Sequence, residues 1–231
     1  MASFIYITDV FCPWCYGFAP VLRRLTAAYG LPVRVLCGNL VDEPEQTSAM
    51  GTPRLHAFFQ RLAGTTGRAA GQGFFDILCP ERSVLMDSSR SAQLMAALKT
   101  LAPGHALEQM EAFQDAFYGE GLDVLALNVQ VDVARRWGVD AAALEQALAS
   151  SAVREKASRE MAEAEDILGD FVVYPSLFVK EGAALHAVAR GFAPYDTVAA
   201  LIGKALSDTG AEAQVSGQAC GLDGSGCCLR S

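Results

Sequence analysis

The sequence, 231 residues long, is poor in positive charge and has no long apolar run. Its 18 lysines and arginines stand against 26 acidic residues, a formal net charge of −8, which gives no electrostatic footprint for nucleic acid or an anionic membrane. No apolar stretch approaches the roughly 20 residues of a transmembrane helix, and the first basic residue, Arg23, comes too late for a secretory signal. We therefore expect no nucleic-acid or membrane partner and a cytoplasmic protein, or a periplasmic one if a signal peptide has been removed.

Ligands for a metal ion are scarce as well. The three histidines, His56, His105 and His186, are isolated, and the chain has a single Cys-x-x-Cys pair, whereas a structural zinc site needs four ligands at suitable spacing. We expect no metal cofactor. The seven cysteines are odd in number, and in a cytosolic protein they favour free thiols with a catalytic pair over a disulfide framework.

The most informative feature present is Cys12-Pro13-Trp14-Cys15, which follows the apolar run of residues 4–7 and precedes a segment of helical period. This context predicts a strand, a tight turn and a helix that begins at the first cysteine. Pro13 suits the first helical position because its fixed φ fits helix entry and its missing N–H has no partner there. Since the N-terminus of a helix carries a partial positive charge and unpaired N–H groups, it stabilises an anion, here the Cys12 thiolate. We predict a redox pair in which Cys12 is exposed and nucleophilic and Cys15 closes or resolves a disulfide.

Further along, the apolar pattern divides the chain into parts. Residues 32–37 alternate as a second strand and make a parallel βαβ opening, while several segments between 43 and 168 have helical period without a convincing strand. Strand patterns return at 175–179 and 187–190 as a hairpin, before a last helix that Pro194 opens. The predicted fold is α/β, with a mixed central sheet and a large all-helical insertion. The predicted parts are a first domain of residues 1–42 and 169–206, an insertion domain of 43–168 and a flexible tail of 207–231.

This order of elements, with Cys-x-x-Cys at the start of the first helix, resembles the thioredoxin fold in its DsbA-type version over about residues 3–206. Pro20, five residues after Cys15, stands where thioredoxin-like proteins place a proline that kinks this helix. The motif from Asp9 to Gly17, Asp-x-x-Cys-Pro-Trp-Cys-Tyr-Gly, resembles most specifically the cytoplasmic, FrnE-like branch of the DsbA family.

The resemblance implies a thiol–disulfide oxidoreductase or isomerase that exchanges disulfides with protein or low-molecular-weight thiols through Cys12 and Cys15. Its redox group would be that disulfide, with no bound cofactor and with glutathione as a candidate co-substrate. The resemblance also places a cis-proline opposite the cysteines at Tyr174-Pro175, which the sequence alone would not assign because few X-Pro bonds are cis. A proline there lacks an N–H and leaves the backbone of Tyr174 as an edge with which an extended substrate could pair.

Two neighbours are expected to tune the pair. Trp14 stands where DsbA has a histidine, so it brings an apolar surface and no positive charge, and we expect a less acidic Cys12 and a less oxidising couple. Asp9 has two roles open to it. It accepts or relays a proton from Cys15, or it bonds nearby backbone N–H groups, as short polar side chains at strand ends usually do.

The remaining cysteines are assigned by their context. Cys37 alternates with the valines of its strand and is expected to be a small buried hydrophobe, and Cys79 has no evident partner. Cys220, Cys227 and Cys228 lie in a Gly- and Ser-rich tail. They are either auxiliary redox or soft-metal thiols that reach the active pair, or part of a silent mobile end.

Two other functions fit parts of the pattern. A glutathione-dependent transferase or isomerase of the kappa or hydroxychromene carboxylate isomerase type shares this architecture, but those relatives use a serine at the site instead of Cys-x-x-Cys. A thiol-rich metal-binding module without turnover would also use the cysteines. Stoichiometric Cu(I) or Zn(II) binding with no exchange activity would favour that module.

Overall fold

The computed structural model describes residues 1–51 and 53–207 of the chain. The strands are β1 (Ala2–Thr8), β2 (Val33–Cys37), β3 (Glu45–Gln46), β4 (Leu85–Met86), β5 (Ser176–Glu181) and β6 (Ala184–Arg190). The helices are α1 (Pro13–Tyr29), α2 (Pro53–Thr66), α3 (Gln72–Asp76), α4 (Ser88–Leu101), α5 (Ala106–Gln114), α6 (Leu127–Ala134), α7 (Ala141–Ala149), α8 (Ser151–Leu168) and α9 (Tyr195–Ser207).

The central sheet has four strands in the order β2-β1-β5-β6. β2 is parallel to β1, and α1 joins the two, whereas β5 is antiparallel to β1 and β6 is antiparallel to β5. The predicted βαβ opening and the predicted hairpin are both confirmed, and the sheet is mixed. β1 is buried from Phe4 to Thr8, which explains its unbroken apolar run, since a strand covered on both faces need not alternate.

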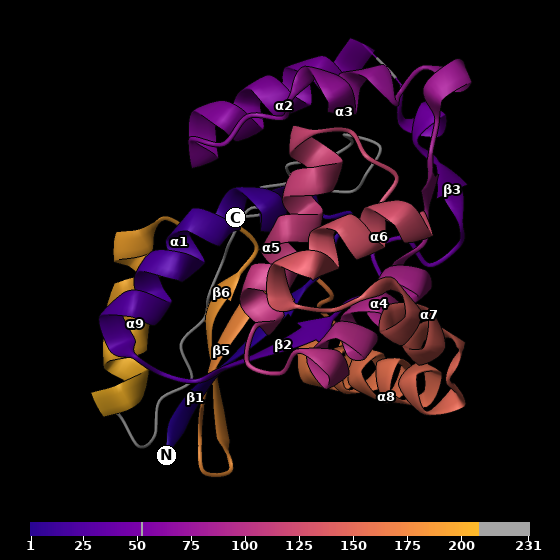
Figure 1. Ribbon diagram of the computed structural model, residues 1–231. Coiled ribbons are helices and arrows are strands. Elements are labelled where there is room, and N and C mark those ends of the chain that lie inside the picture. Colours follow the sequence, from indigo (N-terminus) through magenta and orange to yellow (C-terminus); the bar gives the residue numbers. More distant parts are fainter. Residues whose placement is uncertain (52, 208–231) are drawn as a thin grey trace.

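Helices cover both faces of this sheet (Figure 1). On one side α1 and α9 pack against each other, and α9 also contacts β5 and β6. Aromatic pairs join α1 to β1, with ring centroids 6.3 Å apart for Phe4 and Tyr29 and 6.2 Å apart for Tyr6 and Phe18. On the other side α4, α5 and α8 contact β2. Helices therefore cover both faces of β1, whose end leads through residues 9–12 into the first turn of α1.

Between β2 and β5 the chain is mostly helical, from α2 to α8. It adds one short antiparallel pair, β3 with β4, that the sequence pattern did not predict. The pattern also did not predict α8 as a separate helix. α8 packs on α4, and both helices bury alanines, among them Ala92 and Ala96 in α4 and Ala157 and Ala164 in α8. Small side chains let helices approach closely but give little hydrophobic signal. The division of the chain into domains stays a prediction.

Candidate active site

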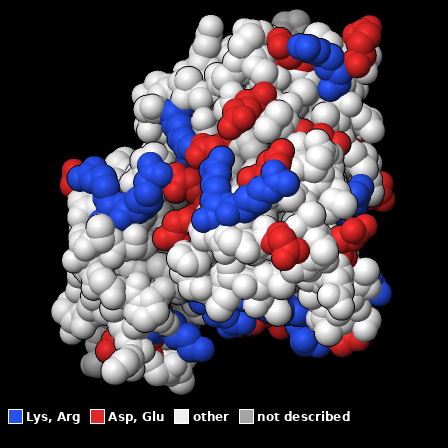
Figure 2. All heavy atoms as spheres, in the orientation of Figure 1, with Lys and Arg blue, Asp and Glu red and all other residues white. Residues whose placement is uncertain are grey.

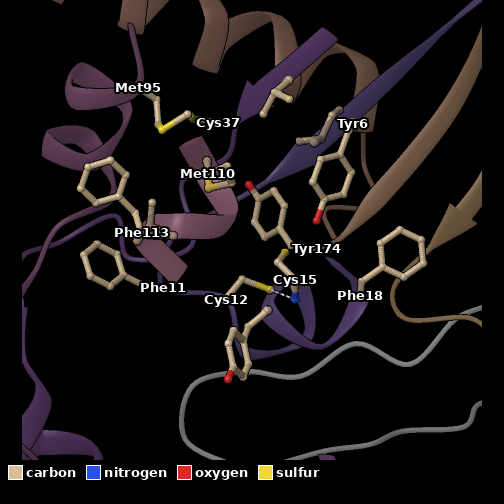
Figure 3. Packing of buried hydrophobic residues seen from close by; sticks show 14 of the residues in the cluster. Tyr6, Phe11, Cys12, Cys15, Phe18, Cys37, Met95, Met110, Phe113 and Tyr174 are labelled. Carbon is tan, nitrogen blue, oxygen red and sulfur yellow. Dashed lines mark hydrogen bonds between the residues drawn. The ribbon is translucent and has the colours of Figure 1, made fainter. Parts of the chain in front are cut away.

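The first turn of α1 holds the two cysteines, and the predicted helix start is confirmed. Cys12 caps the helix with an extended backbone (φ −91°, ψ 111°), and Pro13 occupies the first turn. The Sγ of Cys12 accepts a hydrogen bond from the N–H of Cys15 at 3.2 Å (Figure 3). Because the first N–H groups of a helix have no backbone partner, the sulfur takes the place that a serine or aspartate oxygen takes at other helix starts. Both thiols are free, so the turn is that of the reduced pair.

Cys12 is less accessible than expected. It is 3% exposed and Cys15 is 0% exposed, so the expectation of an exposed Cys12 is wrong for this conformation. The physical reason is that the turn belongs to the buried hydrophobic cluster, together with Phe11, Phe113 and Tyr174, which Figure 3 shows near it. Access for a substrate therefore requires side chains around the turn to move.

The pKa of Cys12 follows from that burial. Burial raises the pKa of the Cys12 thiol well above its usual value, and Cys15 and Asp9 add to the rise, whereas the N–H of Cys15 lowers it. The charges of Cys15 and Asp9 thus destabilise the Cys12 thiolate. The N–H at the helix start stabilises the thiolate, but by less than burial destabilises it.

Trp14 supplies no charge to the pair, as its residue type implies. Its ring lies 6.0 Å from the ring of Phe58 in α2 and 5.9 Å from the ring of Phe192, which follows β6. Trp14 therefore packs between the insertion and the chain after the hairpin. Its indole N–H is buried and has no hydrogen-bond partner among the described residues.

Asp9 is buried and bonds two backbone N–H groups. Its Oδ1 accepts from Phe11 at 2.9 Å and its Oδ2 accepts from Leu40 at 3.2 Å. Burial raises the pKa of Asp9 from 3.8 to about 6, and the Ser88 hydroxyl and the two N–H groups moderate the rise. Of its two predicted roles, Asp9 therefore has the one in which it bonds nearby backbone N–H groups. A proton relay to Cys15 stays a prediction.

Two polar residues of the insertion that the sequence analysis missed also bond the backbone of residues 9–11, between β1 and α1. Gln114 donates from Nε2 to the backbone oxygen of Asp9 at 3.0 Å, and the hydroxyl of Tyr118 donates to the backbone oxygen of Phe11. Gln114 is the last residue of α5, and Tyr118 lies in the π-helical turn Asp115–Gly119 that follows it, a feature often found at functional sites. The sequence did contain a signal for Gln114. It is a polar residue four positions after the buried Met110, and so lies on the same, otherwise apolar, face of the helix.

The peptide bond between Tyr174 and Pro175 is cis, directly before β5, so the geometry that the resemblance implied is confirmed. The hydroxyl of Tyr174 accepts a hydrogen bond from the N–H of Asn39 at 3.0 Å, and burial raises the pKa of Tyr174 to about 12. The ring fits against Gly38, where an added Cβ would lie 2.2 Å from a ring carbon. Tyr174 is thus anchored to the loop after β2. The substrate-binding role of this segment stays a prediction.

The other cysteines divide as follows. Cys37 is buried, as expected, and burial raises its pKa to about 12. Cys79 is exposed. The three tail cysteines, Cys220, Cys227 and Cys228, lie outside the described residues, so their role stays a prediction.

Within residues 1–51 and 53–207, no three histidine, cysteine, aspartate or glutamate side chains lie close enough together to bind a metal ion. None of the described helices combines the length and the apolar character that crossing a membrane requires. On the face drawn in Figure 2, acidic and basic side chains are interleaved rather than gathered by sign.

The sheet order, the thiol pair at the start of α1 and the cis-proline before β5 together define a thioredoxin fold that carries a helical insertion. Residues 5–168 match the family model of the DSBA-like thioredoxin domain. The chain belongs to this DsbA-like family of thiol–disulfide oxidoreductases.

Several solved structures share the fold. A candidate protein disulfide isomerase from Nitrosomonas europaea superposes with a TM-score of 0.72 at 21% identity, over 90% of this chain and 99% of that one. The cytosolic disulfide reductase DsbM from Pseudomonas aeruginosa gives 0.71 at 21% identity, over 89% and 100%, and a structure of DsbM with GSH gives 0.68 at 22%, over 88% and 99%. A 2-hydroxychromene-2-carboxylate isomerase gives 0.58 at 17%, over 88% and 94%. No curated protein sequence matches the chain.

Proposed function

We propose that this protein is a disulfide reductase whose Cys12–Cys15 pair exchanges with disulfides and is returned to the dithiol by glutathione. The observation that carries the proposal is the setting of Cys12, whose sulfur accepts the N–H of Cys15 while burial and Asp9 raise its pKa. A strongly oxidising pair, by contrast, has a stabilised thiolate and hence a stabilised reduced form. The setting of Cys12 favours a couple on the reducing side.

The reaction follows from the positions of the two sulfurs. The Cys12 thiolate attacks one sulfur of a substrate disulfide, which breaks the S–S bond, releases one substrate thiolate and forms a Cys12–substrate mixed disulfide. The thiol of Cys15, whose N–H already reaches the Cys12 sulfur, then loses its proton and attacks Cys12. This step releases the second substrate thiolate and leaves the Cys12–Cys15 disulfide. Two molecules of glutathione restore the dithiol and leave as glutathione disulfide.

The substrate class in this proposal is a small or extended disulfide that can reach the first turn of α1. Disulfides of proteins and of glutathione are both included, and the likeness to the DsbM structure with GSH supports a glutathione partner. The backbone before β5 would pair with an extended substrate, because Pro175 has no N–H and the Tyr174 ring is held at Gly38. The likeness to a cytosolic reductase supports a cytosolic location.

The test is the equilibrium of the Cys12–Cys15 pair in glutathione redox buffers, followed by mass spectrometry of alkylated thiols. We expect a potential near that of thioredoxin, about −270 mV, and insulin reduction with glutathione as the electron source. A potential of about −120 to −180 mV would contradict the reductase proposal and favour an oxidase or isomerase. Cys15→Ala should accumulate the glutathione mixed disulfide at Cys12, while Cys12→Ala should not.

The same assay separates the alternatives and the role of the tail. A chain truncated after residue 210 keeps the described residues, so an unchanged potential would leave Cys220, Cys227 and Cys228 without a redox role. An isomerase of the hydroxychromene carboxylate type should convert its substrate without needing Cys15. A metal-binding module should bind Cu(I) or Zn(II) stoichiometrically and show no exchange.

A further inference from the structure

A proline in the middle of α1 removes a hydrogen bond close to the redox pair. Pro20 lies inside the helix, and because proline has no N–H it leaves the carbonyl four residues earlier, that of Tyr16, without its usual partner. A polar group that is buried and unpaired costs about 1–3 kcal/mol. Tyr16 is 4% exposed and directly follows Cys15, so a second donor is needed beside the active turn.

Arg68, from the loop that follows α2, supplies that donor. Its Nη1 donates to the backbone oxygen of Tyr16 at 3.0 Å. The guanidinium also lies over the Tyr16 ring, 3.9 Å from its centroid, and the Arg68 side chain is only 17% exposed. One arginine thus takes the carbonyl that Pro20 leaves free and packs on the side chain of the same residue.

The insertion holds Arg68 in place. The guanidinium pairs with Asp115, in the π-helical turn, and lies 3.6 Å from a carboxylate oxygen of Glu111 in α5. A planar guanidinium can serve a carbonyl, a carboxylate and an aromatic face at the same time, which the single ammonium of lysine cannot.

The loop also contacts Tyr16 and the residue after it directly. The hydroxyl of Tyr16 donates to the backbone oxygen of Ala69 at 3.0 Å. An added Cβ at Gly17 would lie 2.6 Å from Cγ2 of Thr66, so the end of α2 approaches α1 more closely than a side chain at Gly17 would allow. The insertion is therefore seated on the first turn of α1 and not only on the sheet.

We propose that Arg68 is a positioning residue for the redox pair, which it holds through the backbone of Tyr16. The Tyr16 N–H donates to the carbonyl of Cys12 at 3.0 Å while its own carbonyl binds Arg68, so both backbone groups of Tyr16 are occupied. Holding Tyr16 fixes the turn in which the N–H of Cys15 reaches the Cys12 sulfur. This inference rests on the proposed exchange function and adds that the insertion regulates the pair through this contact.

The first test is Arg68→Met, measured by the pH dependence of Cys12 alkylation and by the equilibrium with glutathione. A looser turn presents the Cys15 N–H less well to the thiolate, so the apparent pKa of Cys12 should rise. Because the reduced pair also makes this hydrogen bond, weakening it should shift the equilibrium toward the disulfide by about five- to tenfold, since one neutral hydrogen bond contributes on this scale. A general loss of fold stability acts on both redox forms and does not move this equilibrium.

Arg23→Met is the matched control, because Arg23 pairs with the same Glu111 but, among the described residues, makes no hydrogen bond to Tyr16. It should leave both readouts within about twofold of the parent, a difference of less than 0.5 kcal/mol. Arg68→Lys separates position from charge. Lysine keeps the charge but lacks the planar guanidinium that stacks on the Tyr16 ring while it donates to the Tyr16 carbonyl. The redox equilibrium of Arg68→Lys should therefore lie nearer that of Arg68→Met than that of the parent.

Pro20→Ala tests the carbonyl itself. Alanine at position 20 supplies a backbone N–H that can donate to the Tyr16 carbonyl, so Arg68→Met should have a much smaller effect in the Pro20→Ala background than in the parent. Equal effects in the two backgrounds, or parent-like behaviour of Arg68→Met or of Arg68→Lys, would overturn the inference. If the parent itself fails to exchange with glutathione, the proposed function fails instead, so the two failures are distinguishable.

Discussion

The first turn of α1 and the end of β2 each carry a buried cysteine, and the two differ in one respect that matters. Cys12 and Cys37 are both 3% exposed, and burial raises the pKa of both. The sulfur of Cys12 accepts the N–H of Cys15. For Cys37, only the charge of Lys99 lowers the pKa among the described residues, and its side chain lies beside Met95 (Figure 3).

Exposure therefore does not separate Cys12, the predicted nucleophile, from Cys37, the predicted core residue. What separates them is the backbone at the sulfur, because a helix start offers N–H groups that a strand has already used in its ladder. A partner thiol one turn away completes the difference. Four changes should break or sharpen this contrast.

The largest effect is expected from removing either sulfur in turn. Cys12→Ala should abolish disulfide exchange, because no other described thiol combines a helix start with a neighbouring cysteine. Cys37→Val should keep exchange within about twofold, since valine fills a similar volume in the core. Insulin reduction with glutathione measures both, and a strong loss in Cys37→Val would remove the contrast.

The next effect concerns Asp9, whose carboxylate bonds Phe11 before the turn and Leu40 after β2 and so ties the two regions together. Its pKa of about 6, against 3.8 as the ordinary value, means that the folded form binds a proton more readily than the unfolded form. The contribution of Asp9 to the free energy of unfolding should therefore fall by about 3 kcal/mol in total as pH rises from about 4 to about 6.

Asp9→Asn should remove this slope, because asparagine does not titrate and keeps one acceptor for the two N–H groups. Urea unfolding of the parent and of Asp9→Asn from pH 4 to pH 7 gives the difference in which all other carboxyl groups cancel. Parallel pH profiles for the two proteins would contradict the prediction.

A smaller effect is expected at Gly38, the residue after Cys37. In Gly38→Ala the new Cβ would lie 2.2 Å from a ring carbon of Tyr174, so the ring must move and its bond to Asn39 must weaken. Overpacking of this kind costs about 1–3 kcal/mol. We expect a lower urea midpoint and slower exchange at Cys12, with Gly64→Ala, where a Cβ meets nothing within 4 Å, as the control.

The smallest effect is expected from Trp14→His, which would place a cation between the cysteines. A positive charge beside a thiolate lowers its pKa, so the apparent pKa of Cys12 should fall by about one unit and the couple should become more oxidising. The pKa of Cys37 should not change. Alkylation of each cysteine as a function of pH, followed by mass spectrometry, tests both statements, and an unchanged Cys12 profile would show that Trp14 does not tune the pair.

The sequence was sufficient wherever the signal is local. A continuous apolar run before Cys12, a proline at the helix start and a hairpin pattern near the C-terminal end predicted the strands, the active turn and the mixed sheet. α8 was missed because part of its buried face is alanine, which carries little hydrophobic signal. Gln114 and Tyr118 were missed because their roles depend on a loop more than 100 residues earlier in the chain.

The sequence by itself placed Cys12 and Cys15 at the start of a helix, since a strand, a turn and a helix start can be predicted from neighbouring residues. Only the tertiary structure decided how far that pair is covered and what holds its turn. Cys12 is buried in a hydrophobic cluster that gathers residues from distant parts of the chain, and the carbonyl freed by Pro20 is bound by Arg68 from the insertion. Burial and hydrogen bonding between distant segments depend on how those segments pack together. The spacing of residues along the chain predicts local structure but not this packing.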